Sequence, residues 1–289
     1  MNKVPFTKPS TTPQQQVALL QSRGITISDS GTAEKFLCYH NYYHVSGYIF
    51  YFEKKELVRT HTLARPVAFE DIILLIKFDQ ALREHCLGAI FTIEAALRSV
   101  MAREISLAYG PFGLEKPALY RNPAYHPQFA DKLRTALSEH KNEPFIAHFC
   151  NKYQEPMPPA WVMIEVLTFG TISRLYSQLT TELQKRIARH FDVDHIILVS
   201  WLKALTELRN TCAHHARLWN KVFVNYPKIR AADRAFPLLT DRHNRLGSFI
   251  PLLTHLLSII GEKKEWLPEL HSLISGISLI KPEDMGLAG

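Results

Sequence analysis

One short stretch of the chain, Arg209 to Asn220, carries the side chains best suited to chemistry on a phosphate. Within it, Arg209 supplies a planar guanidinium, Asn210 an amide, and His214 and His215 two imidazoles. A guanidinium binds a phosphate through two parallel donors, and an imidazole exchanges a proton near neutral pH. Together these groups match phosphodiester cleavage, in which one group moves a proton and another stabilises negative charge.

The motif is expected on a helix or at its end, because the residues before it are apolar at spacings of three, four and seven. On an ideal helix, residues five apart differ by about 500° of rotation. Arg209 and His214 therefore do not project from the same face. They converge if the long arginine side chain wraps around the helix, if the helix loosens at Asn210 and Thr211, or if a second chain completes the site. The apolar positions are Ile196, Ile197, Val199, Trp201, Leu202, Leu205, Leu208 and Cys212.

Two other roles are open to the same residues. Arg-Asn and His-His pairs at a helix end can simply cap carbonyl groups and bind water. Zinc binding by Cys212, His214 and His215 is disfavoured, because three ligands within four residues do not easily form a tetrahedral site. The chain contains neither GxxxxGK[ST] nor GxGxxG, so no glycine-rich phosphate loop is predicted. We expect neither a metal nor another cofactor.

Composition is typical of a globular chain that binds a polyanion. With 289 residues, of which 46% are hydrophobic, a large buried core can form. The N-terminus lacks an apolar segment, and the most apolar later stretch, Leu246 to Ile260, is short, so we expect a cytoplasmic protein that does not span a membrane. The four scattered cysteines suggest no disulfide framework. A formal net charge of +7 favours nucleic acid as a partner.

Periodic apolar residues predict a mostly helical fold made of two parts. Residues 1–64 are expected to form a small N-terminal helical unit, and residues 65–289 a helical domain that contains the motif at 209–214 and ends in terminal helices from about residue 244. The predicted helices are Gln14–Arg23 ended by Gly24, one from about Thr32, Phe69–Ala108 as one helix or two in tandem, one from about Phe129, Trp161–Leu179, Thr181–Arg189, the helix with Arg209, Asn244–Ile260 and Leu267–Leu279.

Two segments are predicted not to be helical. Gly110 to Pro127 is rich in turn-forming residues and is expected to be a surface loop. Tyr48 to Arg59 combines β-branched and aromatic residues, which favour a β-hairpin.

Two pairs of opposite charge lie four residues apart in the long helix. Glu94 precedes Arg98, and Asp79 precedes Arg83. This spacing predicts ion pairs on the helix surface, each stabilising the helix by a few tenths of a kcal/mol.

Several motifs occur in a fixed order along nearly the whole chain. They are Asn41–Tyr48, Phe78-Asp79 with Leu82-Arg83, Ile93-Glu94 with Leu97-Arg98, Pro159–Trp161, Glu165, Leu167–Gly170, Leu175-Tyr176 and Arg209–Asn220. In this order they resemble the Abi family of phage-resistance proteins, of the AbiD and AbiF type. The resemblance implies membership of the HEPN superfamily, whose members are helical bundles with a motif of Arg, a polar residue, a few variable positions and His.

The resemblance implies an endoribonuclease that needs no metal and acts in abortive infection. In this reaction the ribose 2′-OH attacks the neighbouring phosphate and leaves a 2′,3′-cyclic phosphate. His214 would act as general acid or base, Arg209 would stabilise the charge on the phosphorane, and Asn210 would orient one of them. His215 would be an auxiliary residue, and Arg217 would hold the RNA backbone. The alternative is a non-catalytic RNA- or protein-binding module of the same fold.

Partners follow from the same resemblance. RNA is expected as the substrate, with a small structured RNA or a phage trigger as a regulator. HEPN nucleases commonly pair two motifs across a dimer, and this chain has one clear copy, so we expect a homodimer. From their residue type, Tyr42, Tyr43 and Tyr48 are candidates to stack on unpaired bases, although packing in the core of the N-terminal unit is the preferred interpretation.

Overall fold

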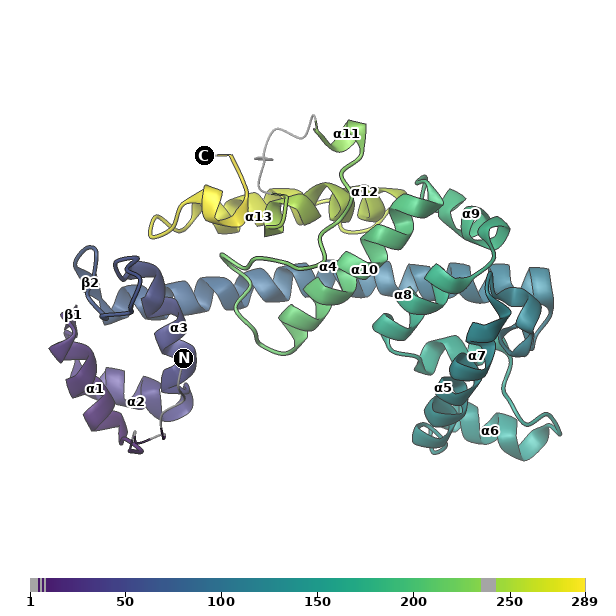
Figure 1. Cartoon of the computed structure of the whole chain (residues 1–289), viewed down its shortest axis with the longest axis horizontal. Helices are drawn as coiled ribbons and strands as arrows, with labels where there is room; N and C mark the ends of the chain where they lie inside the picture. Colours follow the sequence, from purple (N-terminus) through teal and green to yellow (C-terminus); the bar gives the residue numbers. More distant parts are fainter. Residues whose placement is uncertain (1–4, 6, 8, 235–242, 289) are drawn as a thin grey trace. The chain divides into compact units, whose positions relative to one another are not determined.

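The computed structural model describes residue 5, residue 7, residues 9–234 and residues 243–288. The fold is mostly helical, which confirms the predicted class, and the strands among the described residues are two short segments. The chain divides into two compact units. The first extends to residue 81 and includes 277–279, and the second comprises 82–276 and 280–289. The boundary therefore falls inside the long helix shown in blue in Figure 1.

The first unit contains three short helices and one pair of strands. Side-chain oxygens of Thr12, Asp29 and Asn41 cap the starts of the three helices, each accepting a hydrogen bond from a main-chain amide. Gly24 has a φ of +85° just after the first helix, as expected for a residue that ends it. The elements are α1 (Pro13–Ser22), α2 (Ser30–Tyr39), α3 (Tyr42–Phe52), and the parallel pair β1 (Ile25–Thr26) and β2 (Val67–Ala68).

The predicted hairpin from Tyr48 to Arg59 is wrong, because α3 continues to Phe52. The only pairing that follows is an isolated antiparallel bridge between Glu53 and Leu63. The aromatic residues favour a strand by type, but Tyr48 and Phe52 lie four residues apart on the buried face of a helix, while Phe50 is 41% exposed. The apolar residues of that buried face are Val45, Tyr48, Ile49 and Phe52.

The helix α4 (Phe69–Tyr109) is one continuous element of 41 residues, the first of the two arrangements, one helix or two in tandem, that the apolar period allowed. By length and composition alone α4 could cross a membrane, a test that the core helix of a water-soluble protein also passes. One stripe of the helix is buried along its whole length. Its members are Ile72, Leu75, Leu82, Cys86, Ile90, Ile93, Leu97, Met101 and Ile105.

The second unit contains α4 from residue 82 on and the helices that follow it. The segment Gly110–Pro127, predicted to be a surface loop, contains three 3-10 turns. It also buries Leu119 and Tyr120, so it is partly a surface loop and partly a part of the core. The elements are η1 (Gly113–Glu115), η2 (Pro117–Leu119), η3 (Pro123–Tyr125), α5 (His126–Glu139), α6 (Pro144–Lys152), α7 (Ala160–Val166), α8 (Phe169–Gln178), α9 (Thr181–Arg189), α10 (His195–Ala213), α11 (Ala231–Arg234), η4 (Leu246–Phe249), α12 (Ile250–Ile260), α13 (Trp266–Ser275) and η5 (Pro282–Met285).

The segment Trp161–Leu179, predicted as one helix, is two. α7 ends at Val166, and α8 begins after Thr168, whose hydroxyl accepts a hydrogen bond from the amide of Thr171 at 3.2 Å. A Ser or Thr that caps a helix start in this way favours a new helix over continuation of the old one.

Arg98 holds this break in place. Its guanidinium donates to the carbonyl oxygens of Ile164, of Glu165 at 3.3 Å and of Leu167 at 2.6 Å. It also pairs with Glu94, and both side chains are only 12% exposed. Glu94 and Arg98 form the predicted ion pair, but the prediction that it lies on the surface is wrong, because both side chains are mostly buried. Arg98 also caps the end of α7.

The second predicted surface pair is buried as well. Asp79 is 0% exposed and accepts a hydrogen bond from the hydroxyl of Tyr48 at 2.7 Å. Arg83 is 7% exposed. These charged side chains therefore belong to the interior and not to a solvated helix face.

Candidate functional site

α10 carries the motif at its C-terminal end. The helix begins where the carboxylate of Asp194 accepts a hydrogen bond from the amide of Ile196 at 2.8 Å. The predicted apolar stripe is buried from Trp201 on, with Trp201, Leu205 and Leu208 each 0% exposed, whereas Ile196 at its start is 54% exposed. It packs side by side with α8 (Figure 1). The last residues of a long, well-packed helix are thus held in a defined position.

The helix stays regular through Asn210 and Thr211, so the predicted loosening at these residues does not occur. Thr211 is buried, and its hydroxyl donates to the carbonyl of Glu207 at 2.8 Å. The helix instead ends sharply at His214. The amide of Ala216 donates to the carbonyl of Thr211 at 3.1 Å, and His215 has a φ of +56°. This is the pattern of a helix end closed by a left-handed residue, a position that glycine usually occupies.

Arg209 has donors that nothing in the described part of the chain uses. Its Nη1 lies 3.4 Å from the side-chain oxygen of Asn210, a long contact. Its Nε is buried and has no hydrogen-bond partner among the described residues. By comparison, Arg98 donates to three carbonyls, and Arg186 holds Glu104 through Nε at 3.0 Å and Nη2 at 2.6 Å. Arg209 is therefore not used as a structural arginine.

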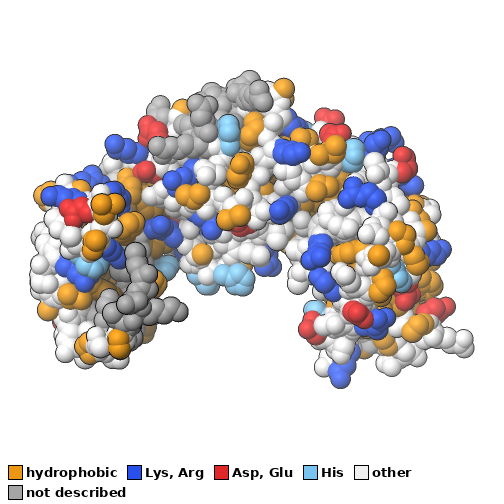
Figure 2. All heavy atoms as spheres, viewed as in Figure 1, with side chains coloured by type: hydrophobic (Ala, Val, Ile, Leu, Met, Phe, Trp, Pro, Cys, Tyr) orange, Lys and Arg blue, Asp and Glu red, His pale blue; other side chains and the backbone are white. Residues whose placement is uncertain are grey.

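The two histidines of the motif are exposed to solvent. Histidine side chains gather on the surface near the place where α10 ends in Figure 1 (Figure 2). Neither His214 nor His215 forms a side-chain hydrogen bond with any residue that the structure describes, and the capping role that each could have played is filled by main-chain groups. Arg217 lies next to them, with its guanidinium 5.9 Å from the ring centre of Trp219.

A cleft of about 790 Å³ opens beside the motif, between α8, α10 and the segment that follows α10. It contacts the motif at Asn210, Thr211 and Ala216. Its other lining residues are Gly170, Ser173, Arg174, Ser177, Val199, Lys203, Thr206, Glu207, Val224 and Asn225. We refer to this space as the α8–α10 cleft.

Glu207 builds one wall of the α8–α10 cleft. Its carboxylate accepts hydrogen bonds from the amides of Val224 at 3.3 Å and Asn225 at 2.7 Å, and from the side-chain amide of Asn225 at 2.9 Å. Lys221 lies 3.8 Å away. Burial raises the pKa of Glu207, but the bonds from Asn225 and Val224 and the charge of Lys221 outweigh it, so the pKa lies below its usual value. Glu207 is thus an ionised carboxylate already bound by its neighbours.

Sequence reasoning missed Glu207, Lys203 and Arg174. Lys203 and Glu207 are charged residues four positions apart in a mostly apolar helix, so they lie on the same side of α10. This spacing is the signal in the sequence that could have identified them. Nothing local to α8 indicates that Arg174 faces the same cleft.

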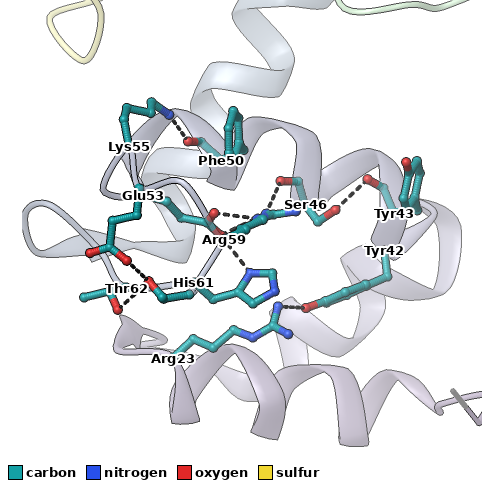
Figure 3. A network of polar contacts seen from close by, with 12 residues as sticks. Arg23, Tyr42, Tyr43, Ser46, Phe50, Glu53, Lys55, Arg59, His61 and Thr62 are labelled. Carbon is teal, nitrogen blue, oxygen red and sulfur yellow. Dashed lines mark hydrogen bonds and ion pairs between the residues drawn. The ribbon is translucent and has the colours of Figure 1, made fainter. Parts of the chain in front are cut away.

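The three tyrosine candidates belong to the first unit and differ in exposure. Tyr48 is 1% exposed, so it packs in the core of the unit as the preferred interpretation predicted, and its ring cannot stack on an RNA base. Tyr42 is half-buried and accepts a hydrogen bond from Nη1 of Arg23 at 2.9 Å, and burial raises the pKa of its hydroxyl (Figure 3). Tyr43 is 85% exposed. Tyr43 is thus the one of the three whose ring is open.

In the same unit, the buried carboxylate of Glu53 binds residues of the turn after α3. Glu53 is 3% exposed and accepts from Arg59 at 2.6 and 2.8 Å and from His61 at 3.0 Å (Figure 3). Burial raises the pKa of Glu53, but the hydrogen bonds from Arg59 and His61 lower it further. These contacts fix the loop and leave few free groups for chemistry.

A comparison with known protein families identifies the family of this chain. Residues 35–220 match the model of a family described as Abi-like protein. The chain belongs to the Abi-like family. The matched segment begins within α2 and ends at Asn220, so it includes the motif and the helices that line the α8–α10 cleft. It is shorter than the nearly complete match that the ordered motifs predicted. No curated protein and no solved structure matches this Abi-like chain.

Proposed function

We propose that this Abi-like protein is a HEPN-type endoribonuclease of the AbiD and AbiF kind that acts in abortive-infection defence against phage. The family match supports the link to abortive infection. The observation that carries the nuclease is Arg209, which at the end of α10 makes one long contact, to Asn210, and leaves its Nε without a partner among the described residues, while His214 is exposed. A guanidinium with free donors can stabilise the charge of a pentavalent phosphate, and an exposed imidazole can move a proton.

In the proposed reaction, the 2′-oxygen of a ribose attacks the adjacent phosphorus, and the bond to the 5′-oxygen of the next nucleotide breaks. The products are a 2′,3′-cyclic phosphate and a free 5′-hydroxyl. His214 moves a proton, either from the 2′-OH or to the leaving oxygen. Arg209 stabilises the charge on the phosphorane, and Asn210, through its contact at 3.4 Å, orients the guanidinium. Among the described residues no group of three metal-binding side chains is present, and the proposed steps use none.

The proposed partners are RNA and a second copy of the chain. Arg209 and His214 of one chain project from different faces of α10, so a homodimer would bring Arg209 of one chain to His214 of the other. We also propose that the protein acts on RNA in the cytoplasm and is restrained by a regulatory RNA until phage infection.

The alternative function is a non-catalytic RNA- or protein-binding module. It predicts that Arg209 and His214 serve the fold, for example by binding main-chain carbonyls. Neither side chain does so with any described residue. The exposed His214 and the unpartnered Nε of Arg209 therefore favour the nuclease over the module.

The test is cleavage of labelled single-stranded RNA by the purified full chain in EDTA. Arg209→Ala and His214→Ala are each expected to lower the rate by about 10² to 10⁴, because one removes charge stabilisation and the other proton transfer. His271→Ala and Arg189→Ala remove exposed residues of the same types elsewhere and should cleave like wild type. Thermal unfolding checks that all variants are folded.

The products separate the two functions. Fragments that end in a 2′,3′-cyclic phosphate, made by wild type and lost in both motif variants, support the nuclease. Intact RNA at every concentration of folded, RNA-binding wild-type protein contradicts it and favours the binding module.

A further inference from the structure

The α8–α10 cleft is lined by small side chains of both helices, among them Gly170 and Ser173 of α8 and Thr206 of α10. The helices approach closely at Gly170, where an added Cβ would lie 3.4 Å from the methyl group of Thr206. At about 790 Å³ the cleft is within the range of pockets that hold small organic ligands. Protein sites that read single-stranded RNA bind its sugars and unstacked bases, whereas duplex RNA is contacted across the grooves of a helix, so a cleft of this volume suits a single strand better.

The charges in the cleft favour an anion. Lys203 and Arg174 are exposed residues of its lining, and Lys203 has no hydrogen-bond or ion-pair partner among the described residues. The guanidinium of Arg174 lies 5.7 Å from the ring centre of Tyr125 and has no acidic partner among the described residues. Glu207 is the one carboxylate in the lining, and its oxygens already bind Val224 and Asn225. The free charges that a ligand meets are therefore positive, which suits a phosphate backbone.

The remaining polar groups can contact riboses and base edges. The hydroxyls of Thr206 and Ser177 donate to carbonyls of their own helices, at 2.8 and 2.7 Å, so their oxygens are left as acceptors. The side-chain amide of Asn210 supplies donors. Val199 and Val224 add apolar surface against which a base or sugar can pack. This mixture of acceptors, donors and apolar walls matches a nucleoside.

The cleft is continuous with the motif. Asn210 belongs to both, and Ala216 lies just beyond the two histidines. Because Asn210 follows Arg209 directly in the chain, a strand whose phosphate contacts Arg209 can extend into the cleft with its next nucleotides.

We propose that the α8–α10 cleft binds the single-stranded RNA segment next to the cleaved bond, with Lys203 and Arg174 on its phosphates. This inference rests on the proposed function, because it names the path of the substrate of that same site. Glu207 is a positioning residue that holds the outer wall through residues 224 and 225.

Binding of a non-cleavable strand tests the cleft without using cleavage as the readout. The probe is a single-stranded oligonucleotide with 2′-fluoro riboses, which lacks the attacking hydroxyl, titrated into full-length protein at several salt concentrations. The double variant Lys203→Ala/Arg174→Ala should weaken binding about tenfold or more. It should also reduce the slope of log K against log salt by about 1.4, the value for two lost phosphate contacts on a single strand.

The matched control is Lys132→Ala/Lys141→Ala, which removes the same number of positive charges from exposed positions in and after α5. It should keep the wild-type slope. A duplex of the same sequence should bind wild type more weakly than the single strand. The cleft inference is overturned if the two double variants lose affinity and slope equally, or if duplex and single strand bind alike.

Cleavage of unmodified RNA by the same variants separates the two proposals. Wild type that binds through the cleft but leaves RNA intact would uphold the cleft and contradict the nuclease. Wild type that cleaves, with a cleft variant that binds and cleaves like the control, would uphold the nuclease and overturn the cleft.

Discussion

At the scale of single residues, His215 is the most unusual feature of the motif. Its φ of +56° lies in the left-handed region, which costs a non-glycine residue about 1 kcal/mol. The helix end that it closes would accept glycine without this strain, since the amides of Ala216 and His215 make the bonds. An imidazole kept in a strained position beside Arg209 and His214 is consistent with an auxiliary role in the proposed reaction.

Replacing His215 by glycine should therefore stabilise the fold and impair cleavage. Relief of the left-handed strain is expected to raise the free energy of unfolding by about 0.5 to 1 kcal/mol. Urea unfolding measures this change, and RNA cleavage measures the loss of the imidazole. The control is His214→Gly, which has an ordinary negative φ of −97° and should gain no stability. Equal destabilisation by both substitutions would contradict the strain argument.

At the scale of elements, a carboxylate of α4 holds α9. Glu104 is 7% exposed and binds Arg186 through one oxygen and His190 through the other, at 3.0 Å, with Arg103 3.7 Å away. Arg186 and His190 form an Arg and His pair in α9 with a spacing that differs from the motif. Because both side chains bind Glu104, this pair has a structural role.

This contact should make stability depend on acid. Burial raises the pKa of Glu104, but the hydrogen bonds from His190 and Arg186 outweigh it and hold the pKa below its usual range. Because the folded-state pKa is depressed, the stabilisation is complete above the unfolded pKa of about 4.3 and is lost as pH falls through the folded value.

Glu104→Gln should lower the free energy of unfolding at pH 7 by about 2 kcal/mol, because it removes charged hydrogen bonds. The difference from wild type should shrink as the pH is lowered below about 4.3. Urea unfolding at a series of pH values measures both effects, with the exposed Glu182→Gln of α9 as the control. A difference that stays constant down to the acid limit would show that the charge of Glu104 is not the cause.

At the scale of the whole molecule, the open question is whether one chain is a complete enzyme. Arg209 and His214 form no hydrogen bond with each other, and the regular helix between them keeps them on different faces. A symmetric dimer places the same surface of two chains together, so an arginine of one can meet a histidine of the other. We therefore expect the proposed site to be shared between two chains.

Mixing the two inactive variants distinguishes a shared site from a single-chain site. If each site combines Arg209 of one chain with His214 of the other, half of the randomly assembled dimers are mixed and hold one intact site. About a quarter of wild-type activity should then return after Arg209→Ala and His214→Ala chains are unfolded and refolded together. No recovery, or a fully active enzyme that sediments as a monomer, would contradict the shared site.

The sequence by itself determined the helical class and the place of the motif. The helices α1, α9 and α10 have one buried face each, so their apolar residues repeat every three or four positions and reveal them locally. The motif was visible because Arg209 and His214 are chemically distinctive residues at the end of an apolar stripe.

Only the tertiary structure decided features that depend on contacts far apart in the chain. The break between α7 and α8 is held by Arg98, more than sixty residues earlier, and the wall of the α8–α10 cleft by Glu207 across a gap of 17 to 18 residues. The same residue types, Arg with Glu four apart or a lone Glu on a helix, are usually solvated. The burial and the partners of these residues follow from tertiary packing, and they cannot be predicted from the local spacing of residues in the sequence.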